Sequence, residues 1–277
     1  AVTVRIASMI GIKRVKRVAK RFGIYEDDLA ENYSMVLGAK ETTLMKLVTG
    51  YSMIANGGRR IAPWLIERID DRNGATIFRR DTRLCEACLS TLSSSDDALA
   101  DVPKAIADVP PTIADERERV LDPRVAYQVT SILRGAVERG TGTAAKVLKR
   151  PIAGKTGTTN ESRDTWFIGY TPDVVVGTYI GFDTPKSLGD KETGGRVAIQ
   201  GFIKFMEQAA NEIPDRDFRP PPVIREVAIN RHSGAPVYEG EPTEEGAAPV
   251  SSLREAFLTG GPIFKPFNEI QEELKNK

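Results

Sequence analysis

Three candidate strands follow one another with very little chain between them. They lie around residues 152–157, 164–170 and 174–182, and the connections at 159–163 and 171–173 are short. A parallel crossover needs about a dozen or more residues, which neither connection provides. The segment therefore predicts three antiparallel strands and excludes a doubly wound parallel sheet.

Helical patterns lie on both sides of these strands. Apolar residues recur at helical intervals over residues 4–18, with a break at Gly11, and further helices are predicted after the N-caps Thr43 and Asp122. Residues 194–213 carry the pattern of a long closing helix. The fold class predicted is therefore mixed α/β (α+β), with an antiparallel sheet flanked by helices.

The segment between the second and third helices has two different characters. Residues 61–81 contain two β-rich runs around Asn73-Gly74, the strongest short signal for a hairpin. Residues 88–116 are rich in Ser, Asp, Ala and Pro and repeat the string ADVP. Such a composition does not bury enough apolar surface to offset chain entropy, so a flexible insertion is predicted at 88–116.

The last part of the chain is predicted to be a separate tail. After Pro214, the runs VIREVAIN and APVYEG flank a turn at 231–234, which predicts a small hairpin. The predicted organisation is one domain over residues 1–214 and a C-terminal tail with a small hairpin over 215–277.

Charge and residue counts exclude several classes of function. The chain has 39 basic and 38 acidic side chains, so a phosphate-binding surface for nucleic acid is not expected. Cys85, Cys88 and His232 are its only Cys and His residues, too few for a zinc site built from such ligands. The cysteines are interpreted as a structural or incidental pair, and the histidine as an exposed turn residue. No metal or cofactor is predicted.

Membrane insertion is not predicted either. The longest run without a formal charge is residues 47–58, which is twelve residues, against the ~18 that a membrane-spanning helix needs.

The most informative segment is Gly154-Lys155-Thr156-Gly157-Thr158. A nucleotide-binding P-loop would need glycine where this chain has Lys149, so that interpretation is rejected. At the edge of a sheet, the same residues offer an ammonium group, two hydroxyls and backbone N–H groups, and the glycine lets a substrate backbone approach closely. Alternation in a strand puts Lys155 and Gly157 on one face, and we expect that alternation to relax near the strand end. The cluster suits a carboxylate next to an acyl group.

This segment resembles the K-T-G motif of the serine penicillin-binding proteins, specifically the class A transpeptidases. Three residues recur by chance, but the surrounding strings are more specific. They are TTLMKLVTGYSMIANGGRRIAPWLI, RVAYQVTSILRGAVERGTGTAA, RPIAGKTGTTNESRDTWFIGYTPDVVVGTYIGFD and TGGRVAIQGFIKFM. The resemblance runs from residue 1 to about 215, with 88–116 as a departure, and REAFLTGGPI resembles the end of such proteins. It implies the penicillin-binding, serine β-lactamase-like transpeptidase fold.

Two of the family's three motifs are missing. No Ser-x-x-Lys occurs, the nearest string being Thr43-Leu-Met-Lys46, and no Ser-x-Asn occurs. In the family, Ser-x-Asn directly precedes a segment similar to AVTVRIA at residues 1–7. The resemblance therefore implies a C-terminal piece, incomplete at its N-terminus, whose nucleophilic serine lies upstream or on another chain. Such a piece alone is predicted to be inactive.

The resemblance implies a role for each matching residue. Lys155 and Thr158 would be catalytic, the first by polarising the site and the second by forming half of the oxyanion hole with its N–H. Lys155, Thr156, Gly157, Thr158 and Asn160 would bind substrate, with the loop at 139–143 bordering the cleft.

The implied activity is D,D-transpeptidation of peptidoglycan. D-Ala-D-Ala stem peptides and β-lactams are the expected ligands, and the upstream half of the protein is the expected partner. The whole protein would lie on the extracytoplasmic face of the membrane, with an anchor and a glycosyltransferase domain. Two alternatives remain: a D,D-carboxypeptidase or β-lactamase-like hydrolase, and a non-catalytic module that binds stem peptides.

Overall fold

The computed structural model describes residues 2–25, 31–81, 115–237 and 251–259. The chain forms two compact units. One comprises Ala1–Ile61 with Arg119–Lys277, and the other is Ala62–Glu118. Cys85, Cys88 and nearly all of the predicted insertion at 88–116 lie outside the described residues.

The centre of the larger unit is a three-stranded antiparallel sheet. Strands β3 (Ala153–Thr158), β4 (Thr165–Tyr170) and β5 (Val175–Ile180) lie in the order β3-β4-β5. Each pairs residue by residue with its neighbour along the chain, without a bulge. The three strands expected from the short connections are confirmed.

With the exception of the closing helix, the predicted helices of this unit begin close to where the sequence predicts. Thr43 and Asp122 accept hydrogen bonds from the first turns of their helices, and Gly11 separates the first two helices. In chain order the helices are α1 (Val2–Ile10), α2 (Ile12–Arg21), the 3₁₀ helix η1 (Tyr33–Leu37), α3 (Leu44–Ala55), α6 (Pro123–Glu138), the 3₁₀ helices η2 (Thr143–Leu148) and η3 (Asn160–Ser162), and α7 (Ala198–Gln208).

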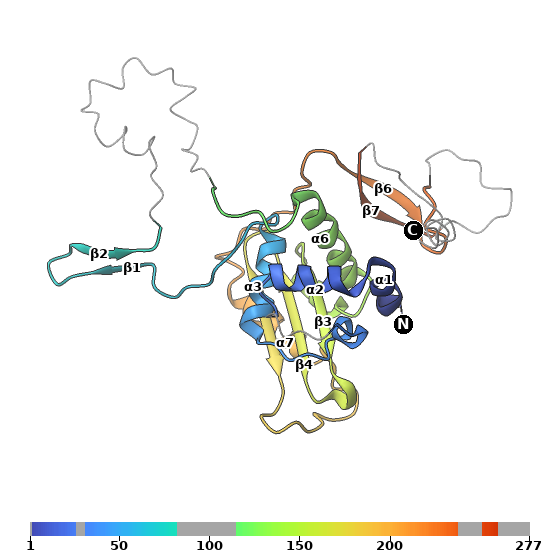
Figure 1. Ribbon diagram of the computed structural model, residues 1–277, viewed down its shortest axis with the longest axis horizontal. Helices are drawn as coiled ribbons and strands as arrows, with labels where there is room; N and C mark the ends of the chain where they lie inside the picture. The colour runs from blue at the N-terminus through green and yellow to red at the C-terminus, as the bar shows by residue number, and fades with distance from the viewer. Residues whose placement is uncertain (1, 26–30, 82–114, 238–250, 260–277) are drawn as a thin grey trace, which may run out of the picture. The chain divides into compact units, whose positions relative to one another are not determined.

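The sheet is covered by helices on both faces (Figure 1). On one face the buried ring of Phe167 packs edge-on against Phe202 of α7, with ring centroids 5.0 Å apart. On the other face Tyr170 contacts Tyr51 of α3 and donates to or accepts from Thr130 of α6. Because residues 167 and 170 alternate in β4, two separate hydrophobic clusters form, one on each face. The predicted mixed α/β class is confirmed.

The closing helix is shorter than the sequence pattern predicts. The expected helix at 194–213 begins only at Ala198 and ends at Gln208. The prediction fails at the start because Gly194 and Gly195 pack against strand β3 and loop 139–143. A Cβ on Gly194 would lie 2.4 Å from the carbonyl oxygen of Gly157.

The tail contains a two-stranded sheet with a partner that the sequence did not reveal. The turn at 231–234 forms, and the returning residues 235–237 pair back onto 228–230: the Asn230 N–H donates to the carbonyl of Ala235 and the Val237 N–H to that of Ala228, both at 2.8 Å. The main partner of β6 (Ile224–Asn230) is β7 (Ser252–Leu258), antiparallel over seven pairs. The expected hairpin with APVYEG therefore forms as far as Val237, the last described residue of that run, and β6 has in β7 a second partner that the local pattern did not predict.

The smaller unit contains the hairpin predicted at Asn73-Gly74. Strands β1 (Arg68–Asp70) and β2 (Thr76–Arg79) pair antiparallel. The turn is stabilised by the Asp71 carboxylate, which accepts hydrogen bonds from the backbone N–H groups of Asn73 and Ala75.

Truncation of Phe202 is expected to weaken the fold. Its side chain is fully buried between α7 and β4, so Phe202→Ala should lower the free energy of unfolding by about 3–5 kcal/mol. Phe205→Ala on the same helix is the control, because that side chain is 46% exposed and should cost less than about 1 kcal/mol. Denaturant unfolding of both variants checks this, and equal losses would contradict the assigned core.

Candidate active site

Strand β3 turns the backbone groups of alternate residues toward its outer edge. In the part of the chain that the structure describes, β3 has only β4 as a neighbour. The Thr159 N–H donates to the carbonyl of Asp164 at 3.0 Å. Hydrogen-bonded positions alternate along an antiparallel pair, so residues 157 and 155 also direct their N–H and C=O groups toward β4. The N–H and C=O groups of Thr156 and Thr158 therefore point away from β4, toward the outer edge.

Lys155 lies beside this edge. Its ammonium nitrogen donates to the carbonyl oxygen of Thr156 at 2.8 Å. That contact agrees with the ladder, because the Thr156 carbonyl is one of the groups directed outward. Desolvation by the surrounding protein lowers the pKa of Lys155 from its ordinary value of 10.5.

The hydroxyls of Thr156 and Thr158 both have partners from other parts of the chain. The Oγ1 atoms of Thr141 and Thr156 lie 2.6 Å apart, and the Gly194 N–H donates to Thr158 Oγ1 at 3.0 Å. Because the Thr158 oxygen accepts from Gly194, its own proton is left for a further acceptor.

Strict alternation persists to the end of β3, contrary to our expectation that it relaxes there. The unbroken pairing with β4 puts Lys155 on the face of α3 and α6, and Thr156 and Thr158 on the face of α7. The ammonium and hydroxyl groups therefore meet only at the outer edge, around the exposed backbone, and not on one face.

The loop at 139–143 holds Thr141 in a tight turn at the end of α6. The Gly142 N–H donates to the carbonyl of Ala136 at 2.9 Å. A Cβ on Gly140 would lie 2.9 Å from the same carbonyl oxygen, so the turn needs glycine at that position. The contact between Thr141 and Thr156 places this loop beside β3.

The other two predicted site residues differ in their surroundings. Gly157 faces Trp166 across the ladder, and a Cβ there would lie 3.1 Å from the Cβ of Trp166. Asn160 lies beyond the strand, at the start of η3, with an exposed side chain.

Gly194 is the residue of this cluster that the sequence reasoning missed. The sequence pattern places Gly194 and Gly195 at the start of the predicted helix at 194–213. Two adjacent glycines at a helix start were the available signal, because they allow a close backbone approach.

Other kinds of site are not supported by the described residues. They contain no group of three or more His, Cys, Asp or Glu side chains placed to hold a metal ion. Within the same ranges, every helix is too short or too polar to cross a bilayer. A hollow of about 170 Å³ lies between the ends of α3 and α6 and residues 218–221, and no residue of β3 lines it.

Comparison with known proteins identifies the family. Residues 1–207 match the model of the penicillin-binding protein transpeptidase domain. Penicillin-binding protein 1A of Rickettsia typhi is 45% identical over 239 residues, which is 86% of this chain and 29% of the relative. The chain belongs to the penicillin-binding protein transpeptidase family. The resemblance noted from the K-T-G segment and its surroundings is thereby confirmed.

Two further members extend the match within this family. Penicillin-binding protein 1A of Pseudomonas aeruginosa is 32% identical over 288 residues, covering 95% of this chain and 35% of the relative. The crystal structure of penicillin-binding protein 1A from Haemophilus influenzae has a TM-score of 0.74 and 26% identity, and covers 96% of this chain and 39% of that one. The transpeptidase fold is confirmed, and the chain spans well under half the length of these relatives.

Substitution of Gly194 is expected to disturb this edge of the transpeptidase fold. In Gly194→Ala the new Cβ meets backbone oxygens of Gly157 and Trp166, which cannot rotate away, so unfolding should become about 1–3 kcal/mol easier. Gly50→Ala is the control, because the nearest atoms to its Cβ belong to side chains, the closest being the end of Ile24 at 3.3 Å. Denaturant unfolding compares the two variants, and a harmless Gly194→Ala would contradict the close approach.

Proposed function

We propose that this chain supplies the anion-binding and oxyanion-stabilising part of a peptidoglycan D,D-transpeptidase. The observation that carries the proposal is the outward direction of the Thr158 N–H at the edge of β3, with the Lys155 ammonium and the Thr158 hydroxyl beside it. A preorganised N–H donor in such a place stabilises the oxyanion of a tetrahedral intermediate.

The substrate proposed is the D-Ala-D-Ala end of a stem peptide. An extended peptide laid along β3 has its terminal carboxylate within reach of Lys155 and of the Thr156 and Thr158 hydroxyls. Because charge-assisted hydrogen bonds are about twice as strong as neutral ones, these groups orient the terminus. Gly157 leaves room for the peptide backbone, and Asn160 borders the far end.

The proposed reaction is acyl transfer through a serine ester. A serine from a Ser-x-x-Lys segment, which this chain does not contain, attacks the carbonyl carbon of the penultimate D-Ala. The C–N bond to the last D-Ala then breaks, and that residue leaves as the protonated amine. An amine on a neighbouring strand attacks the ester, which frees the serine. In a hydrolase, water would take the amine's place.

The whole protein is proposed to act outside the cytoplasmic membrane, where peptidoglycan is cross-linked. Its proposed partners are stem peptides, β-lactams and the part of the protein that carries the nucleophile. A membrane anchor and a glycosyltransferase domain are proposed for the whole protein from the family resemblance.

Labelled benzylpenicillin tests this function on the whole protein that contains this chain. A covalent adduct that survives denaturation is expected, and it should form about 10²–10³-fold more slowly in Thr158→Pro, which lacks the N–H donor. Thr158→Ser keeps the donor and the hydroxyl and is the matched control. This chain alone, without a Ser-x-x-Lys serine, should form no adduct.

The outcome distinguishes the functions considered. If the whole protein forms no adduct but still binds stem peptides, it is a non-catalytic binding module and not an enzyme. An adduct with release of free acid, even when an acceptor amine is supplied, would indicate a hydrolase.

The pH dependence of the acylation rate should report the titration of the Lys155 ammonium group. Desolvation lowers its pKa, so the positive charge that attracts the carboxylate is lost at a lower pH than for an ordinary lysine at 10.5. The rate should therefore decline, as pH rises, at a midpoint below 10.5. In Lys155→Arg, whose guanidinium stays charged, the decline should move to higher pH. An unmoved midpoint would assign the titration to another group.

A further inference from the structure

We propose that Glu255 on strand β7 is a positioning residue for the active site. Through Arg139, it would hold the loop that carries Thr141, and Thr141 in turn would orient the Thr156 hydroxyl. The inference rests on the proposed function, because it gives the Thr156 hydroxyl the task of binding a substrate carboxylate.

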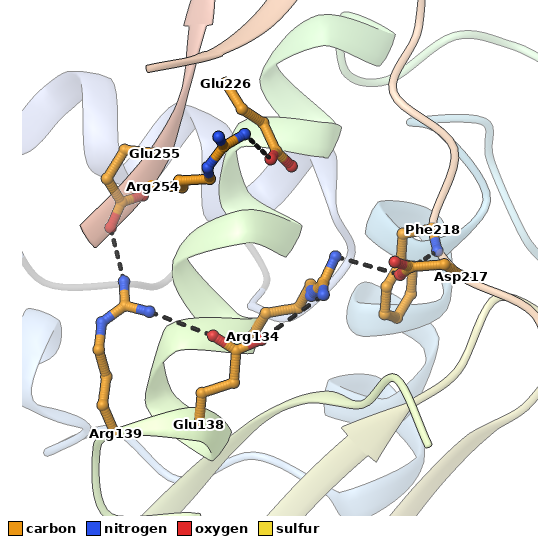
Figure 2. Close-up of polar contacts among 8 residues, drawn as sticks. All are labelled: Arg134, Glu138, Arg139, Asp217, Phe218, Glu226, Arg254 and Glu255. Atoms are coloured by element: carbon orange, nitrogen blue, oxygen red, sulfur yellow. Dashed lines mark hydrogen bonds and ion pairs between the residues drawn. The ribbon is translucent and has the colours of Figure 1, made fainter. Parts of the chain in front are cut away.

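The first link is an ion pair between the tail and the end of α6 (Figure 2). The guanidinium of Arg139 donates to Glu255 at 2.7 Å, and its other side lies 3.3 Å from Glu138. The Arg139 and Glu255 side chains are only 31% and 22% exposed. A close, partly buried pair constrains its side chains more than an open surface pair does.

The position of the Arg139 side chain is further defined by the helix beneath it. A Cβ on Gly135 would lie 2.6 Å from a guanidinium nitrogen of Arg139, so the guanidinium occupies the space that this glycine leaves. Glu138 also contacts Arg134, which pairs with Asp217 at 3.1 Å. Arg139 is therefore held from several sides at the end of α6.

The second link is the attachment of β7 to α6. Gln128 of α6 donates to the carbonyl of Ala256 at 3.1 Å, and Ala256 is buried in the same cluster as Tyr127 and Phe218. Because Ala256 follows Glu255 directly, the carboxylate is presented to Arg139 from a strand that the hydrophobic core already holds.

The third link runs from Arg139 to the active-site strand. Only Gly140 separates Arg139 from Thr141, and the Gly142 N–H ties the turn back to α6. One residue thus separates the ion pair of Arg139 from the 2.6 Å contact between Thr141 and Thr156. A shift of Arg139 would move the Thr141 hydroxyl relative to β3.

The consequence concerns the proton of the Thr156 hydroxyl. In the pair of hydroxyls, one donates and the other accepts. When Thr141 donates to Thr156, the Thr156 proton is available to a carboxylate; when the contact is lost, the Thr156 hydroxyl rotates freely. Recognition of a carboxylate should therefore depend on Glu255, whereas attack on the acyl carbon should not.

Acylation of the whole protein by benzylpenicillin and by its methyl ester tests this, because only the first carries a carboxylate. In Glu255→Ala and Arg139→Ala, acylation by benzylpenicillin should fall by about three- to tenfold, and acylation by the ester should stay nearly unchanged. The double variant should lose no more than either single one, because the two residues act as one pair. Glu255→Gln, which retains an acceptor oxygen, should lose less.

Arg254→Ala is the matched control. Arg254 precedes Glu255 on the same strand, and its contact with Glu226 is long, at 3.9 Å, with side chains 68% and 44% exposed. Its ratio of the two acylation rates should equal that of the unmodified protein. Equal losses for penicillin and ester in Glu255→Ala, additive losses, or no loss would overturn the positioning role.

Failure of the proposed function is distinguishable from failure of this inference. If penicillin does not acylate the unmodified protein, the proposed function fails. Amide hydrogen exchange at Gly142, whose N–H is bonded to the carbonyl of Ala136 in the same turn as Thr141, then tests whether Glu255 holds this loop: faster exchange in Glu255→Ala than in Arg254→Ala supports the coupling, and equal exchange overturns it.

Discussion

The candidate active site depends on which residues of β3 direct their N–H and C=O groups toward β4 and which direct them outward. Pairing of β3 with β4 proceeds without a bulge from Ala153 to Thr158, so each residue's backbone direction follows from its position. A shift of one residue would turn the Thr158 N–H inward and put the Lys155 side chain on the other face. The large apolar rings on the two faces of β4 oppose such a shift, because Phe167 and Tyr170 belong to different hydrophobic clusters.

Close backbone approach explains why glycines gather around this edge. The chain leaves α6 through one tight turn beside β3, and returns to the same strand before α7 through another. Side chains at Gly140 or Gly194 would collide with backbone oxygens, which have no freedom to move aside. These glycines have no side-chain functional group of their own. They nevertheless allow the close approach that gives the threonine hydroxyls fixed partners.

Much of the fold could be predicted from the sequence, because its signals are local. Short connections imply antiparallel strands, Thr43 and Asp122 mark helix starts, and Asn73-Gly74 marks a hairpin. The errors arose where distant chain segments meet. Residues 194–197 have helical periodicity, but contact with β3 prevents the helix from starting there. The main partner of β6 lies beyond a stretch that no local pattern bridges, so the pairing with β7 was missed.

The same distinction applies to the candidate active site. Lys155, Thr156 and Thr158 were predicted because a short motif places them on one strand. The hydrogen-bond partners of the two threonine hydroxyls come from a loop 15 residues earlier and a turn 36 residues later, and nothing in the motif specifies them. An isolated hydroxyl rotates among several acceptors, whereas one that already accepts a backbone N–H has its proton directed elsewhere. The motif therefore supplies the chemical groups, and residues outside it decide in which direction those groups can donate.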